Sequence, residues 1–178
     1  MTVVLEELTE EDTERLASAV EDRIRRIVQF FKEFPLFGSF TEEDAHLLSE
    51  LCYTHYLRRK QVFFRQGVKH DQLDGLFMVR RGMVQIYRPI SRLREEKIAV
   101  ASAGEIFGEL SLVLTEPHSA SIRAVNDSEL IEITRETYEE IKTHHIHLAV
   151  KLMELMLKVL AKRLGRTTKM LFSPTRIK

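Results

Sequence analysis

The sequence predicts a mainly β protein, a jelly-roll β-barrel with one helix before it and a long helix after it. Two observations lead to this expectation. Short apolar runs separated by turn residues follow one another from Tyr56 to Ile133, which is typical of antiparallel strands in a sandwich or barrel. On both sides of this region, apolar residues recur at steps of three and four, which indicates amphipathic helices.

The first helix is expected to begin at Thr9, because Thr9 and Asp12 have the spacing of a capping box. Pro35 closes the helix, so residues 1–35 are assigned to an N-terminal helical extension. Its apolar stripe consists of Leu16, Val20, Ile24, Ile27, Phe31 and Phe34.

The predicted barrel occupies residues 36–134. Leu76–Val79 and Met83–Tyr87 read as strands, and Arg80-Arg81-Gly82 between them predicts a tight hairpin. Further strands are expected at Val62–Gln66, Ile98–Val100, Ser119–Val125 and Glu129–Ile133.

Two helices are predicted over residues 135–165, with a bend at His144–His147. The second helix is expected to end at Gly165, because glycine favours helix C-termini, and residues 166–178 form a basic tail. Two apolar stripes imply burial on two sides, one against the barrel and one against a partner. One stripe is Leu148, Leu152, Leu155 and Val159, and the other is Ala149, Met153, Met156 and Leu160.

The strongest functional signal is the segment from Phe107 to Ala124, which begins Phe-Gly-Glu-Leu-Ser-Leu and continues through Pro117-His118-Ser119-Ala120. A glycine lets the backbone approach a ligand closely, and a short helix after it presents N–H groups to an anion. Glu109 suits a sugar hydroxyl, because an ionised carboxylate only accepts hydrogen bonds. Ser119 can donate to a phosphate oxygen.

This segment resembles the phosphate-binding cassette of the cyclic-nucleotide-binding domain family, approximately F-G-E-L-A-L-x-x-x-x-P-R-A-A-T-x-x-A. The spacing matches without a gap, and His118 stands where the family has its phosphate-binding arginine. The resemblance covers about 36–164 and implies a cassette at 107–121 within a catabolite-activator-like sensor domain without a helix-turn-helix. It also implies a homodimer through residues 148–164 and a ribose contact from Glu109. The ligand-binding residues it implies are Phe107, Gly108, Glu109, Leu110, Ser111, His118, Ser119 and Ala120, with Leu171 or Phe172 as a lid over the base.

His118 decides how much function the resemblance carries. Arginine offers a permanently charged fork to phosphate, whereas imidazole has an ordinary pKa of about 6.5. Losing a charged hydrogen bond weakens binding about ten- to a hundredfold. We therefore expect a regulatory sensor that binds cyclic AMP, cyclic GMP or a related nucleotide weakly, and more tightly at pH 6 than at pH 8. The alternative is a degenerate fold that acts as a dimeric protein-interaction scaffold without a nucleotide.

Catalysis has little support, since the sequence contains no G-x-S-x-G elbow, P-loop or HExxH motif. A jelly roll can house a cupin-like metal enzyme, but that needs a His-x-His pair on a strand. His145-Ile146-His147 lies in a predicted helical region, so we expect no enzyme, metal or cofactor.

Composition and charge are those of an ordinary globular domain, with a net charge of zero over 178 residues. No apolar run is long enough to span a bilayer, and Cys52 is the one cysteine, so a cytoplasmic location is expected. Residues 1–22 are acidic and residues 158–178 are basic, which predicts two solvated ends or two ends that attract each other. We expect no DNA-binding helix-turn-helix after Gly165, because only 13 residues follow it in the given sequence.

Overall fold

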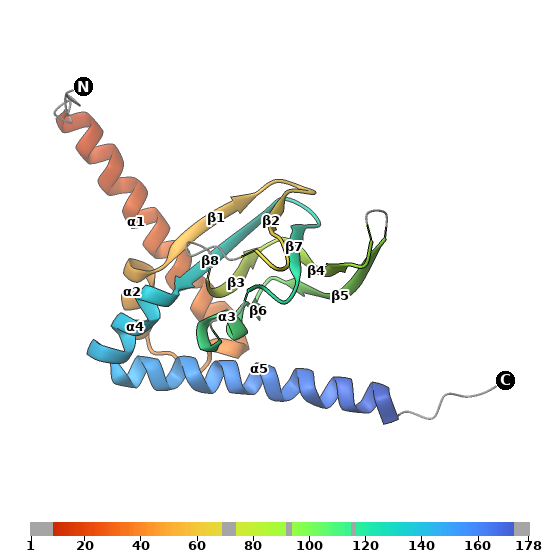
Figure 1. Cartoon of the computed structure of the whole chain (residues 1–178). Helices are drawn as coiled ribbons and strands as arrows, with labels where there is room; N and C mark the ends of the chain where they lie inside the picture. Colours follow the sequence, from red (N-terminus) through yellow and green to blue (C-terminus); the bar gives the residue numbers. More distant parts are fainter. Residues whose placement is uncertain (1–8, 69–73, 92–93, 115–116, 173–178) are drawn as a thin grey trace, which may run out of the picture. The chain divides into compact units, whose positions relative to one another are not determined.

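The computed structural model describes residues 9–68, 74–91, 94–114 and 117–172 (Figure 1). The chain divides into two compact units, residues 1–50 and residues 51–178. Within the described residues, no helix combines the length and the apolar character needed to cross a membrane.

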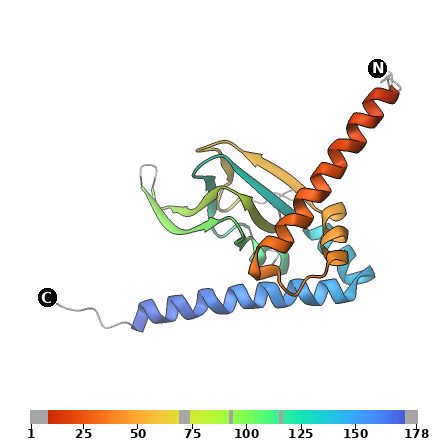
Figure 2. The same cartoon turned by 180° about the vertical axis from the view of Figure 1, so that it is seen from behind.

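The larger unit contains two antiparallel sheets of four strands, so the predicted jelly-roll class is confirmed (Figures 1 and 2). The strand order is β1-β8-β3-β6 in the first sheet and β2-β7-β4-β5 in the second. The strands are β1 (Tyr53–Leu57), β2 (Val62–Phe64), β3 (Gly75–Arg81), β4 (Met83–Pro89), β5 (Glu95–Ser102), β6 (Ile106–Phe107), β7 (Ser121–Ala124) and β8 (Ser128–Thr134).

The hairpin predicted at Arg80-Arg81-Gly82 is wrong. The two strands that flank Gly82 lie in different sheets: β3 pairs with β6 and β8, while β4 pairs with β5 and β7. Gly82 has a φ of +88°, and a Cβ there would lie 2.4 Å from Oγ of Ser128. The glycine is needed because the chain turns from one sheet to the other against this serine.

Aromatic side chains pack against one another inside the barrel, among aliphatic residues. Phe77 of β3 is fully buried, and its ring stacks on Phe107 of β6 with a centroid separation of 5.2 Å. Phe64 packs against Phe77 from the second sheet. Leu76 and Met78, which point to the other side of β3, are also fully buried. Strand β3 is therefore buried on both faces, and the site is attached to this strand.

The C-terminal part of the larger unit contains α4 (Arg135–His144) and α5 (Ile146–Phe172). The break at His145 agrees with the predicted bend. The predicted end at Gly165 is wrong, because α5 continues through it to Phe172. A glycine inside a helix costs only about 1 kcal/mol relative to alanine, and good helix formers on both sides offset it.

The two stripes predicted on α5 do not separate as expected. Leu148, Leu152 and Leu155 are buried, but so are Ala149 and Met156 of the second stripe. The exposed apolar row is instead Ile146, Val150, Met153, Leu157 and Leu164.

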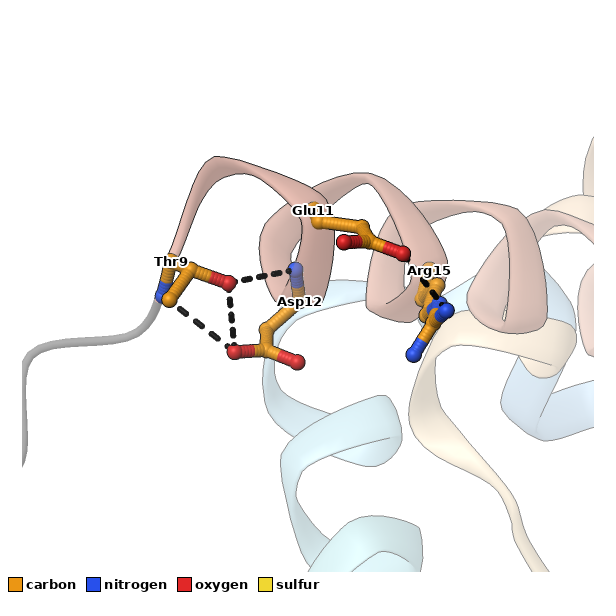
Figure 3. Close-up of polar contacts among 4 residues, drawn as sticks. All are labelled: Thr9, Glu11, Asp12 and Arg15. Atoms are coloured by element: carbon orange, nitrogen blue, oxygen red, sulfur yellow. Dashed lines mark hydrogen bonds and ion pairs between the residues drawn. The ribbon is translucent and has the colours of Figure 1, made fainter.

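The smaller unit consists of α1 (Glu10–Glu33), a 3-10 turn (Pro35–Phe37) and α2 (Glu42–Leu51), whose last residue lies past the boundary of the unit. The capping box predicted at Thr9 is present: the side chain of Thr9 accepts from N–H of Asp12, and the carboxylate of Asp12 accepts from N–H of Thr9 (Figure 3). Glu11 and Arg15 add an ion pair in the next turn, 2.6 Å apart (Figure 3).

Candidate functional site

The cassette begins where β6 turns into the short helix α3 (Glu109–Val113). Gly108 makes this turn with a φ of +83°, and a Cβ there would lie 2.4 Å from the carbonyl oxygen of Gly75. Any side chain at this position would push α3 away from β3, so the glycine places the cassette directly on the sheet.

Hydrogen bonds hold α3 at both ends. Oγ of Ser111 lies 2.7 Å from the carbonyl oxygen of Gly108 and 3.2 Å from that of Gly75. Arg135, the first residue of α4, donates to the carbonyl oxygens of Leu112 and Leu114 at 3.0 Å each. The bonds from Arg135 satisfy carbonyl groups at the C-terminal end of α3, where intrahelical partners are lacking. The cassette helix is therefore tied to β3 at its start and to α4 at its end.

Glu109 is the buried charge of the cassette, with 4% of its surface exposed. Its Oε1 accepts from Nη1 of Arg163 on α5. Nη2 of the same arginine donates to the carbonyl oxygen of Ile106 at 2.5 Å. Oε2 of Glu109 is buried and has no hydrogen-bond partner among the described residues. The carboxylate thus keeps one acceptor atom for another donor.

Arg163 was missed by the sequence reasoning, which counted it only as one charge of the basic C-terminal segment. A signal was present, because Arg163 continues the buried stripe of α5 at a step of four beyond Val159. A long side chain at that position can lie along the barrel and reach a buried carboxylate.

His118 is turned toward the interior of the barrel and is 7% exposed. Its ring stacks on Phe64, with centroids 3.9 Å apart and an interplanar angle of 14°. Its Nε2 lies 3.6 Å from Oδ1 of Asp74. Its carbonyl oxygen accepts from N–H of Gly67 at 2.9 Å. Glu109 and His118 therefore have different neighbours, a cation from α5 in one case and an aromatic ring with a carboxylate in the other.

Of the other predicted site residues, Leu110, Ser111 and Ser119 line one cavity, whereas Phe107 and Ala120 do not. A cavity of about 100 Å³ is lined by Leu110, Ser111 and Leu114 of the helical side and by Pro117, His118 and Ser119 of the following segment. Ser119 is exposed and Ala120 is half-buried. Phe107 lies in the core, stacked on Phe77. The volume suits a small group such as a phosphate, and Glu109 is not among the residues that line it.

The predicted lid residues lie at the end of α5. Phe172 is 81% exposed and does not cover the cassette in this structure. The side chain of Leu171 and residues 173–178 lie outside the described part of the chain, as do Thr115 and Glu116 of the cassette. Among the residues that are described, no group of three or more His, Cys, Asp or Glu side chains could hold a metal ion.

Comparison with known proteins gives consistent results for this region. The family described as "Cyclic nucleotide-binding domain" matches residues 54–145. The cyclic AMP receptor protein of Thermus thermophilus is 36% identical over 108 residues, which is 60% of this chain and 48% of that protein. Patatin-like phospholipase domain-containing protein 6 of Mus musculus is 31% identical over 100 residues, 56% of this chain and 7% of that protein. The chain thus spans about half or less of the length of these relatives.

Solved structures show the same fold. The catabolite activator protein of Thermus thermophilus is similar with a TM-score of 0.64 and 29% identity, over 77% of this chain and 61% of that one. A cyclic nucleotide-binding domain from Methylobacillus flagellatus has a TM-score of 0.72 and 22% identity, over 89% of this chain and 87% of that one. At 22% identity the second likeness concerns the fold alone.

Proposed function

The chain belongs to the cyclic nucleotide-binding domain family, and from this premise we propose that it is a regulatory module that binds a cyclic nucleotide, with cyclic AMP as the first candidate. It acts by binding, without catalysing a reaction. The observation that carries the proposal is the buried carboxylate of Glu109, whose Oε2 has no partner among the described residues. A buried acceptor without a donor costs about 1–3 kcal/mol, and a ribose 2′-hydroxyl supplies that donor.

Calorimetric titration with cyclic AMP and 2′-deoxy cyclic AMP tests this proposal. We expect the unmodified protein to bind the deoxy compound about ten- to a hundredfold more weakly, since a hydrogen bond to a charged group is lost. Glu109→Gln should weaken cyclic AMP and reduce the difference between the two ligands. Glu96→Gln removes an exposed carboxylate from β5 and serves as the matched control. Equal affinity for both ligands in the unmodified protein would rule out the role of Glu109.

The second candidate is a dimeric interaction scaffold without a nucleotide. The contact between Glu109 and Arg163 favours it, because the arginine already occupies one oxygen of the carboxylate. Thermal unfolding with saturating cyclic AMP and cyclic GMP distinguishes the two candidates. A ligand at a hundred times its dissociation constant adds about 2.7 kcal/mol to the stability of the folded protein. An unchanged unfolding temperature with both nucleotides would favour the scaffold.

Both candidates include a homodimer through α5. The exposed row from Ile146 to Leu164 has steps of four, three, four and seven, which is the heptad spacing of a coiled-coil seam. Leu157 is 67% exposed in the middle of this row. Sedimentation should therefore show a dimer that Leu157→Glu converts to a monomer. Lys162→Glu, which also introduces a glutamate but outside the row, should leave the dimer intact, and a monomeric unmodified protein at high micromolar concentration would end the proposal.

A further inference from the structure

The position that holds a phosphate-binding arginine in the family's cassette pattern holds no exposed cation here. His118 is buried between the ring of Phe64 and the carboxylate of Asp74. An anion that approached Nε2 would have to displace or neutralise Asp74, since two like charges at one partner repel. If the cassette binds a phosphate, another cation must supply most of the charge.

Arg88, near the end of β4, lies at the cassette. Its Nε donates to the carbonyl oxygen of Ser119 at 3.2 Å, and Ser119 directly follows His118. The side chain is exposed. Nε is the one guanidinium nitrogen that this bond uses, so the two Nη groups are left for a ligand. Ser119 is itself exposed, and its hydroxyl is a further donor.

Three other arginines near the cassette are already engaged. Arg123 binds both carboxylate oxygens of Glu95 at 2.7 and 3.4 Å and lies over the ring of Tyr87. Arg135 is held by the carbonyl oxygens at the end of α3. Arg163 is held by Glu109. Within the described part of the chain, Arg88 makes no ion pair, although it contacts the cassette backbone.

We propose that Arg88 and Ser119 form an anion subsite at the edge of the pocket, which Ser119 lines, and bind the cyclic phosphodiester of the nucleotide in place of His118. The inference rests on the proposed function and assigns the phosphate to a residue of β4. A guanidinium already anchored by Nε presents its two Nη groups as a fork to two phosphate oxygens. The bond to Ser119 also limits the rotamers of Arg88 before the ligand arrives, which lowers the entropic cost of binding.

Calorimetry with three probes tests the subsite: cyclic AMP, adenosine and inorganic phosphate. Arg88→Gln should weaken cyclic AMP about ten- to a hundredfold and leave the affinity for adenosine unchanged. Arg88→Lys should lose less, because it keeps the charge without the fork. Lys97→Gln removes an exposed cation from the neighbouring strand β5 and should change the affinity for cyclic AMP by less than twofold.

Three results would overturn the inference. Unchanged cyclic AMP affinity in Arg88→Gln would leave the phosphate without a contact from Arg88. An equal loss for cyclic AMP and adenosine would indicate a general distortion of the pocket. Inorganic phosphate that bound as tightly as cyclic AMP would indicate a free-phosphate site. An unmodified protein that bound neither cyclic AMP nor adenosine would instead refute the proposed function, and the subsite with it.

Discussion

Two buried carboxylates of the larger unit each have one basic partner, and the partners come from different places. Nε2 of His55 on β1 lies 2.5 Å from Oε2 of Glu132 on β8, and these two strands pair directly. Arg163, the partner of Glu109, comes from α5, 54 residues along the chain. The backbones that carry the first pair are held together by the ladder between β1 and β8, whereas the second pair joins α5 to the cassette, two elements that share no ladder. The source of the partner thus decides whether a buried charge is a fixed support or a contact that ligand binding can change.

The two carboxylates share a second property. Oε1 of Glu132 and Oε2 of Glu109 are both buried without a hydrogen-bond partner among the described residues. Each is therefore sensitive to loss of its single partner, because a buried charge without compensation is strongly unfavourable. Loss of the partner of Glu132 should mainly lower stability, whereas loss of the partner of Glu109 should mainly lower the affinity for the ligand.

The largest effect is expected from His55→Ala, which leaves the buried carboxylate of Glu132 without its hydrogen-bond partner. We expect the free energy of unfolding to fall by about 3 kcal/mol, because a buried carboxylate that loses its donor is left unsatisfied. Urea unfolding at pH 7 measures the change. His147→Ala, at an exposed histidine, should stay within about 0.5 kcal/mol. A loss of stability no greater than that of the control would show that the contact between His55 and Glu132 does not stabilise the fold.

A smaller loss of stability is expected from Arg163→Ala. The arginine side chain is 40% exposed, so solvent reduces the strength of its ion pair, and we expect a loss of about 1 kcal/mol. Affinity for cyclic AMP should fall about tenfold, because Arg163 holds Glu109 in place. Amide hydrogen exchange should accelerate in the last turns of α5 and remain unchanged in β8. Lys162→Ala is the control, and a stability loss equal to that of His55→Ala would contradict the comparison.

The smallest effect is expected at the exposed pair of Lys32 and Glu42, whose side chains lie 3.0 Å apart in the smaller unit. The hydrogen bond from Lys32 and its charge hold the pKa of Glu42 below 4.5. Because the pKa is lowered on folding, the pair stabilises the fold above about pH 4.5, and this contribution is lost as the pH falls through the lowered pKa. NMR titration should show Lys32→Ala returning the pKa of Glu42 toward 4.5. A clear drop in the unfolding midpoint of this variant at pH 7 would show that exposed pairs are also fixed supports.

Local signals in the sequence were enough for α1, α4 and most of α5, for most strands and for the capping box at Thr9. Each depends on residues close together in the chain, such as Thr9 and Asp12. The prediction of a hairpin at Gly82 was wrong because a turn glycine indicates only that the chain changes direction. It does not indicate which strands will pair. That choice depends on β6 and β8, which come much later in the sequence.

The composition of the cassette could be read from the sequence, but its contacts could not. The role of Gly108 follows from the residue type, since a close approach of backbones needs a glycine. The direction of the His118 ring is set by Phe64 and Asp74, which lie on other segments of the barrel. Arg163 reaches Glu109 only because α5 runs past the cassette. The step of four from Val159 places Arg163 on the buried stripe, but it does not identify Glu109 as the partner.

The continuity of α5 through Gly165 turns the end of this domain into a lever. A helix of 27 residues is about 40 Å long, and Arg163 fixes it to the cassette roughly two-thirds of the way along. If α5 tilts about its contact at Arg163, Phe172 moves farther than Arg163 does. A break at Gly165 would have allowed the helix to bend there, whereas a continuous helix transmits the tilt to its last turn.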